Sequence, residues 1–192
     1  MKELSLNILD VAENSVKAGA SLTQILLTEQ DDTLTIEIVD DGCGMSAHVV
    51  RSVTDPFYTT RTTRKVGLGI PLLKLACEQT GGNLAISSVT QEEDPVNHGT
   101  HVTATFHTDH IDFTPLGDVS SSILTLIQGH PERDFLFRHQ IDGNVVELDT
   151  RNLREVLEDV PLNSYDVMEW VRGYLQEQYE TLSEDSVHSG EE

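Results

Sequence analysis

Two glycines, Gly67 and Gly69, stand where a polar loop meets an apolar stretch that has the pattern of a helix. Helix N-termini expose unpaired N–H groups and partial positive charge, so they readily receive phosphate groups. Glycine has no Cβ and lets the backbone approach a ligand closely. Three cations precede the glycines in the same loop: Arg61, Arg64 and Lys65. The pattern, with Leu68 between the glycines, fits a phosphate contact, although an ordinary turn or a solvated charged loop would look the same.

A carboxylate and an amide lie four residues apart in the first apolar stretch, at Asp10 and Asn14. This spacing places both side chains on one face of a helix. A carboxylate can orient or deprotonate a nucleophile, and an amide oxygen can ligate Mg²⁺, which prefers hard oxygen ligands. An arbitrary pair at this spacing more often belongs to the exposed face of an amphipathic helix, so the hypothesis needs further support.

A third set of polar and small residues, Asp40, Gly42 and Gly44, follows an apolar strand. A carboxylate there can accept a hydrogen bond from an exocyclic amine, while the glycines let a flat base approach the backbone. The same residue types are common in strand-to-helix turns. Thr100, at the start of a later strand, is a weaker candidate because Thr is also a good strand former.

The elements that must position these residues follow from hydrophobic periodicity and from turn residues. We predict helices at 4–19, from Ser46 onward and at 68–80, and strands at 22–28, 33–39, 83–89 and 100–107. This order predicts an α/β sandwich in which helices cover one face of an antiparallel or mixed sheet.

The chain changes character after His107, where apolar periodicity restarts and acidic residues increase. We predict a helix at 115–129, a hairpin of 134–140 and 145–149 around Asp142-Gly143, and helices at 150–159 and 163–182. The predicted organisation is therefore a domain at 1–108, a small α+β extension at 109–182 and a flexible acidic tail at 183–192.

The charge of the chain limits the partners it can have. The formal net charge is −21, and residues 109–192 contribute −14 of it, from 19 acidic and five basic residues. Such a chain repels polyanions, so we expect neither nucleic acid nor an anionic membrane as a partner. No apolar run approaches the ~20 residues of a membrane span. The two cysteines, Cys43 and Cys77, form no disulfide framework, which fits a cytoplasmic location.

In this order and spacing, the three sets of residues are more specific than any one alone. The motifs are ILDVAENSVKAGA, VDDGCGM, DPFYTTRTTRKVGLGIPLLK, GGNLAI and HGTHVTATF. They cover about residues 4–108, which resemble the GHKL ATPase family of histidine kinases, anti-sigma-factor kinases, MutL-type repair ATPases, type II topoisomerases and heat-shock chaperones. The resemblance implies a Bergerat-type α/β sandwich that binds ATP and Mg²⁺, with a short lid at about residues 58–66.

The resemblance also implies a role for each matching position. Asn14 would hold Mg²⁺, and Asp40 would accept the hydrogen bond of the adenine amine. Thr100 would support Asp40 through its hydroxyl group. Gly42 and Gly44 would line the base pocket; Gly67, Leu68 and Gly69 would contact the phosphates, with Arg61, Arg64 and Lys65 as nearby cations.

Two features depart from the family pattern. Asp10 stands where many relatives have a general-base Glu, and its side chain is one methylene shorter, which leaves fast ATP hydrolysis open. The resemblance begins at residue 4, so we expect a stand-alone ATP-binding domain without upstream helices that carry a phospho-accepting His.

Two functions fit these observations best. The first is a regulatory kinase that binds Mg-ATP, docks a protein partner and transfers the γ-phosphoryl group to it. Residues 109–182 are a candidate docking region for that partner. The alternative is a nucleotide-gated interaction module with slow or no hydrolysis, and either form is compatible with a homodimer. A repair- or topoisomerase-like ATPase fits less well because of the net charge of −21.

Overall fold

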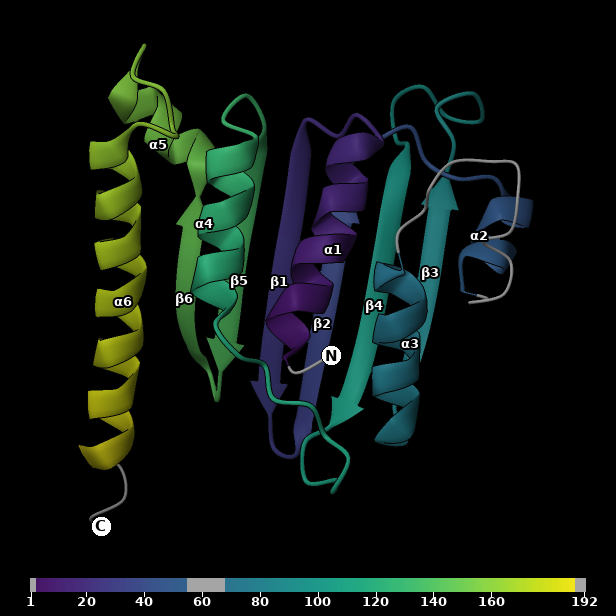
Figure 1. Ribbon diagram of the computed structural model, residues 1–192, viewed down its shortest axis with the longest axis horizontal. Helices are drawn as coiled ribbons and strands as arrows, with labels where there is room; N and C mark the ends of the chain where they lie inside the picture. The colour runs from purple at the N-terminus through teal and green to yellow at the C-terminus, as the bar shows by residue number, and fades with distance from the viewer. Residues whose placement is uncertain (1–2, 55–67, 189–192) are drawn as a thin grey trace.

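A single mixed sheet forms the framework of the protein, whose computed structural model describes residues 3–54 and 68–188 (Figure 1). The sheet has six strands in the order β3-β4-β2-β1-β5-β6. The strands are β1 (Leu22–Gln30), β2 (Thr33–Asp40), β3 (Asn83–Val89), β4 (Gly99–His107), β5 (Asp134–Ile141) and β6 (Asn144–Asp149). This architecture confirms the predicted α/β sandwich.

All neighbouring strands are antiparallel except β1 and β5, which run parallel. Tight turns close two of the hairpins, β1–β2 and β5–β6. In the β5–β6 turn, Asp142 and Gly143 have φ angles of 47° and 90°, the positive values that a two-residue hairpin turn of this type needs. The parallel pair requires a crossover connection, and the helix α4 (Val119–Gly129) lies within it.

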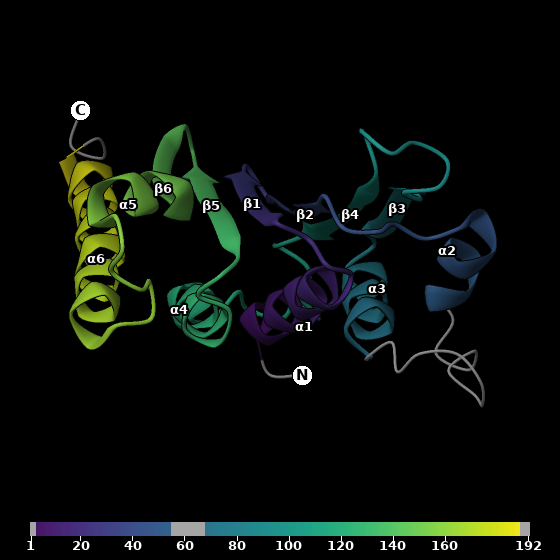
Figure 2. The same cartoon turned by 90° about the horizontal axis from the view of Figure 1, so that it is seen from above.

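Three helices, α1 (Leu4–Lys17), α3 (Gly69–Gln79) and α4, lie on one face of the sheet (Figure 2). Their apolar faces pack against every second residue of the strands, including Ile25, Ile36 and Ile38, which are buried. Helix α2 (Ala47–Val53) follows β2, while α5 (Thr150–Leu157) and α6 (Tyr165–His188) complete the far end. No helix in the described part of the chain is both long and apolar enough to cross a membrane.

Two helices begin or end at other residues than predicted, because residues at their ends stop the helix. Helix α4 begins at Val119 rather than at 115, because the Asp118 side chain accepts a hydrogen bond from the Ser121 N–H and so caps the helix. Helix α1 ends at Lys17, two residues earlier than predicted, and Gly19 then turns the chain with a φ angle of +80°.

The strands of the extension join the same sheet as the strands of the first 108 residues. Strand β5 pairs with β1 from Leu22 opposite Asp134 to Glu29 opposite Ile141. At the sheet edge, the side-chain amide of Gln178 in α6 accepts a hydrogen bond from the Glu147 N–H at 3.0 Å and donates one to the Glu147 carbonyl at 3.1 Å. This amide satisfies edge groups of β6 that would otherwise be open to another strand. The division at residue 108 stays a prediction.

Candidate functional site

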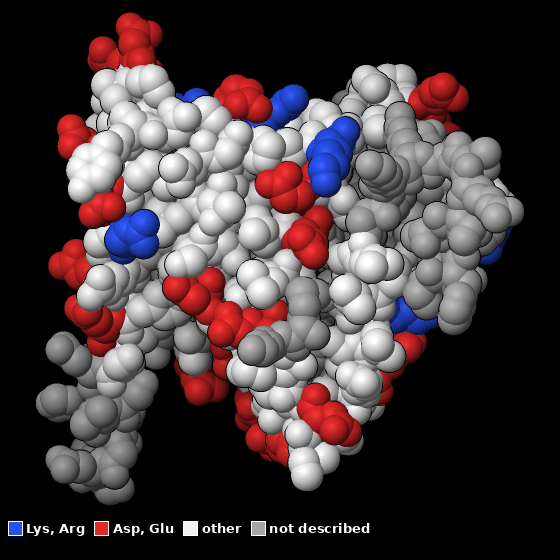
Figure 3. Space-filling model, in the orientation of Figure 1, with Lys and Arg blue, Asp and Glu red and all other residues white. Residues whose placement is uncertain are grey.

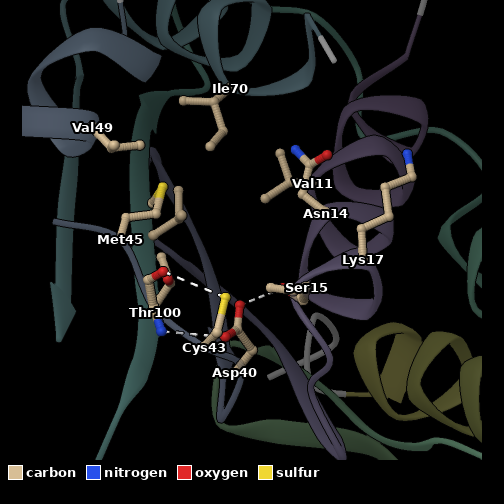
Figure 4. A pocket seen from close by; sticks show the side chains of 13 residues that line it. Val11, Asn14, Ser15, Lys17, Asp40, Cys43, Met45, Val49, Ile70 and Thr100 are labelled. Atoms are coloured by element: carbon tan, nitrogen blue, oxygen red, sulfur yellow. Dashed lines mark hydrogen bonds between the residues drawn. The ribbon is translucent and has the colours of Figure 1, made fainter. Parts of the chain in front are cut away.

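A cavity of about 410 Å³ opens between α1, the chain that follows β2, strand β4 and the start of α3 (Figure 4). The residues that line it come from segments far apart in the sequence: Val11, Asn14, Ser15, Lys17, Ala18, Asp40, Cys43, Gly44, Met45, Val49, Ile70, Thr100 and Val102. The apolar residues give the cavity walls that suit a flat ring, and the few polar groups can orient it.

The carboxylate of Asp40 is the most precisely held polar group of the cavity. Its Oδ2 accepts a hydrogen bond from the Ser15 hydroxyl at 2.6 Å, and its Oδ1 accepts from the Gly42 N–H at 2.9 Å and the Thr100 N–H at 3.2 Å. These donors come from a helix, a turn and a neighbouring strand, so the orientation of the carboxylate is fixed. A carboxylate offers about four acceptor positions, and one therefore remains for a ligand donor.

Thr100 donates a hydrogen bond to Asp40 from its backbone N–H. The family resemblance implied a contact through its hydroxyl group instead. The hydroxyl oxygen lies 2.8 Å from the hydroxyl oxygen of Ser88 on β3. Ser88 in turn accepts a hydrogen bond from the Met45 N–H at 2.8 Å. The Ser88 hydroxyl thus joins the loop after β2 to β4, a role that no sequence spacing indicated.

The glycines after Asp40 allow close packing of the chain around the cavity. Gly44 lines the cavity with a φ angle of +70°, and a Cβ there would lie 1.9 Å from the Val89 carbonyl oxygen. Gly42 is buried, and a Cβ there would lie 2.9 Å from the Ala18 Cβ. Both positions therefore require glycine for the protein's own packing, and a contact with a bound base stays a prediction.

Helix α1 carries Asp10 and Asn14 at the spacing that predicted a shared face, but only Asn14 lines the cavity. The Asn14 amide nitrogen is buried, and the described residues give it no hydrogen-bond partner. Asp10 is exposed one turn earlier and lies against the first residue of α3, since a Cβ on Gly69 would lie 2.9 Å from the Asp10 Cβ. The helix thus brings Asn14 to the cavity wall and places Asp10 one turn away, against Gly69.

An unpartnered amide at this place suits a divalent cation. The oxygen and nitrogen of an amide exchange positions by a simple flip, so Asn14 can present its oxygen to the cavity. Mg²⁺ takes such oxygen ligands together with water and phosphate oxygens. The donor set of the described residues therefore fits Mg²⁺ when a phosphate ligand supplies further oxygens.

Sequence reasoning missed Lys17, which lines the cavity three residues after Asn14 on the same helix (Figure 4). The i, i+3 spacing from Asn14 was the available signal. Leu68 is exposed directly before α3, where Gly69 forms the first helical residue. The other predicted phosphate contacts, Arg61, Arg64, Lys65 and Gly67, lie outside the described residues.

Asp41, next to Asp40, ties the same turn to the start of β1. Its carboxylate accepts hydrogen bonds from the Leu22 N–H at 3.0 Å, the Ser21 N–H at 2.7 Å and the Ser21 hydroxyl. Burial alone would raise the pKa of Asp41, but the hydrogen bonds from Leu22 and Ser21 together hold it below its usual value. Asp41 therefore fixes the strand end on which Asp40 lies.

Comparison with known protein families gives a match over residues 2–110. The matching family is described as histidine kinase-, DNA gyrase B-, and HSP90-like ATPase. Among curated proteins, the signal transduction histidine-protein kinase AtoS of Escherichia coli (strain K12) is 28% identical over 89 residues, which is 46% of this chain and 14% of that protein. Sporulation kinase B of Bacillus subtilis (strain 168) is 26% identical over 92 residues, 48% of this chain and 21% of that protein. The chain thus spans about a fifth or less of these relatives.

Solved structures share the fold over a larger part of the chain. The N-terminal domain of a DNA repair protein has a TM-score of 0.55 at 16% identity and covers 78% of this chain and 53% of its own. The Aquifex aeolicus MutL ATPase domain complexed with ADP has a TM-score of 0.50 at 15% identity and covers 82% of this chain and 70% of its own. These shares exceed what residues 1–108 supply, so the likeness includes part of the extension.

Proposed function

The chain belongs to the histidine kinase-, DNA gyrase B- and HSP90-like ATPase family, and we propose that its cavity binds Mg-ATP in order to act on a protein partner. The observation that carries this proposal is the carboxylate of Asp40. Three donors fix its direction inside a cavity of about 410 Å³, and one acceptor position is left for an exocyclic amine.

The base and the phosphates would lie at opposite ends of the cavity. Asp40 and Gly44 would mark the end for the adenine, while Asn14, one turn of α1 after the Asp10 that lies against Gly69, would mark the side that leads to the start of α3. Asn14 would hold the Mg²⁺, which neutralises phosphate charge when bound. Lys17 would add a second cation on the same helix. The Aquifex aeolicus MutL ATPase domain, which shares this fold, was solved with ADP.

We propose that the bound ATP serves a regulatory kinase that transfers its γ-phosphoryl group to a protein. Phosphoryl transfer needs mainly positioning and charge neutralisation, which Asn14, Lys17 and the cations of the loop can supply. The relatives AtoS and sporulation kinase B are kinases by name, which supports this class of reaction.

The first experiment tests nucleotide binding by itself. Mg-ATP should raise the melting temperature of the wild-type protein, and Asn14→Ala should remove most of the part that depends on Mg²⁺. Asn97→Ala, an exposed amide outside the cavity, is the matched control and should behave as wild type. A wild-type protein whose melting temperature ignores Mg-ATP would refute the site.

The second experiment follows the phosphoryl group. Incubation with γ-labelled ATP and co-purified protein partners should move the label to a partner, and Asp40→Asn should prevent this. Label that stays on ATP with every partner, despite tight binding, would exclude the kinase.

One observation favours the alternative, a nucleotide-gated interaction module with slow or no hydrolysis. Asp10, at the position of the expected general base, is exposed and does not line the cavity. For this function, ATP should change the affinity for a partner while phosphate release stays near background. An affinity that ATP and ADP leave unchanged would rule it out.

A further inference from the structure

Helix α6 exposes two stacked aromatic rings that neither line the cavity nor lie in the hydrophobic core. The rings of Trp170 and Tyr174 lie with centroids 4.9 Å apart and an angle of 12° between their planes. Trp170 is 52% exposed and Tyr174 37% exposed, whereas Val171 and Leu175 of the same helix are fully buried. The helix therefore packs into the core through one face and presents the aromatic pair beside it.

Acidic residues bracket the pair along the same stripe of the helix. Asp166 lies four residues before Trp170, and Glu177 lies three residues after Tyr174, spacings that place all four side chains on one face. We define the aromatic stripe as Asp166, Trp170, Tyr174 and Glu177. Its acids are exposed, and acidic side chains follow α6 along the left edge of the molecule in Figure 3.

A glycine in the middle of α6 adds an independent observation. Gly173 lies next to Tyr174, and a Cβ there would meet nothing within 4 Å. Glycine inside a helix costs about 1 kcal/mol relative to alanine. Since no contact within the described chain requires this glycine, its absent side chain leaves space for close approach from outside.

We propose that the aromatic stripe docks a segment of a protein partner that carries arginine or lysine side chains. A cation over a Trp or Tyr ring is attracted by the ring electrons, and an Arg guanidinium can also stack on the rings. Asp166 and Glu177 can pair with neighbouring cations, and residues 109–192, the extension together with the acidic tail, carry a charge of −14 from 19 acidic and five basic residues. An acidic surface of this kind attracts a basic partner and repels a second copy of itself.

This inference rests on the proposed action upon a protein partner and names where that partner binds. Its test needs no nucleotide, so it can fail while ATP binding succeeds, and the reverse. Trp170 is the single tryptophan of the chain, and its fluorescence therefore reports on the stripe directly.

The probe is a tetrapeptide of arginine, and a tetrapeptide of neutral citrulline has the same shape without the charge. Arginine should change the Trp170 fluorescence in a saturable way that weakens with salt, and citrulline should not. Tyr174→Ala, and separately Asp166→Asn with Glu177→Gln, should each weaken the binding about threefold, as expected for exposed cation–π and ionic contacts. Tyr165→Ala removes a 77% exposed aromatic on another face of α6 and should leave binding unchanged.

Gly173→Ala separates docking from folding. The substitution should raise the melting temperature by about 2–4 °C, because alanine favours the helix, and yet weaken the binding of the arginine peptide. The proposal is overturned if arginine and citrulline act alike, or if the stripe variants bind as wild type. It is also overturned if sedimentation shows a dimer that Trp170→Ala dissociates, since the stripe would then join two copies of the chain.

Discussion

Two polar side chains on the same sheet, Asp40 at the end of β2 and His139 in β5, differ in whether the protein satisfies all of their hydrogen-bonding positions. The protein donates three hydrogen bonds to Asp40 and leaves it one acceptor position beside a cavity. His139 is 2% exposed, and the protein occupies both of its ring nitrogens: Nδ1 lies 2.7 Å from the Tyr179 hydroxyl and Nε2 lies 2.8 Å from Glu29 Oε1.

The difference separates a site built for a ligand from a site built for the fold. Burial, reinforced by the charges of Glu29 and Asp118, raises the pKa of Tyr179 well above its usual value, so its hydroxyl keeps its proton and its hydrogen bond. The His139 network is complete and joins β1, β5 and α6. The Asp40 network is incomplete until a further donor arrives, which is the property expected of a binding residue.

The largest effect should come from Asp40→Asn. The asparagine oxygen can accept from the Gly42 and Thr100 N–H groups, and its NH₂ group can donate to the Ser15 hydroxyl oxygen, but the charge and the second acceptor oxygen are lost. We expect Mg-ATP to bind about 100-fold more weakly, or about 2–3 kcal/mol, while the free energy of unfolding changes by less than about 1 kcal/mol. Calorimetric titration and urea unfolding measure the two quantities. Unchanged affinity for Mg-ATP would show that Asp40, like His139, makes its hydrogen bonds only within the protein.

His139→Phe should give the opposite result, a loss of stability without a loss of binding. It leaves Glu29 and Tyr179 without their shared partner, and we expect the free energy of unfolding to fall by about 2 kcal/mol. His101→Phe is the matched control: its ring lies 2.9 Å from Glu37, but the His101 side chain is 41% exposed, so the expected loss is below about 0.5 kcal/mol. Equal losses in urea unfolding would contradict the comparison.

The sequence predicted the fold well because its elements depend on local patterns. The alternation in β2 and the i, i+3, i+4 pattern of α1 each determine a buried face without reference to the rest of the chain. The parallel pairing of β5 with β1 was not predicted, since it depends on a crossover whose destination no local pattern records.

The candidate site was predicted in its members but not in its contacts. Asp40 and Asn14 were identified by type and spacing, and both line the cavity. Ser15 and Ser88 were missed, because a serine that supports a carboxylate or a loop is defined by a partner 25 or 43 residues away. Hydrogen bonds of this kind are properties of the fold, and a single sequence contains no period that reveals them.

The neighbouring carboxylates Asp40 and Asp41 allow a finer version of the comparison through pH. The pKa of Asp41 is lowered in the folded protein, so its stabilisation is present above the unfolded value of 3.8 and is lost as the pH falls through the folded value. Because the Asp41 side chain is exposed, solvent screens its charge, and Asp41→Asn should lower the free energy of unfolding by only about 0.5 kcal/mol at pH 7. Wild type and variant should converge in acid below pH 3.8. Urea unfolding across this range measures the difference. A difference in the free energy of unfolding that stays constant with pH would show that the charge of Asp41 does not contribute to stability.

The smallest expected effect is a change in the rate at which a cysteine in the cavity is alkylated, compared with a buried cysteine. Cys43 lines the cavity, while Cys77 is fully buried, and burial together with the nearby charge of Glu78 raises the pKa of Cys77 to about 11. Because the thiolate is the reactive form, iodoacetamide at pH 8 should label Cys43 and leave Cys77 as an unreactive internal reference. Mg-ATP at its Kd should roughly halve the Cys43 rate, since half of the cavities are then occupied. Mass spectrometry of the labelled peptides measures both rates, and a Cys43 rate that ignores saturating ATP would place the nucleotide outside this cavity.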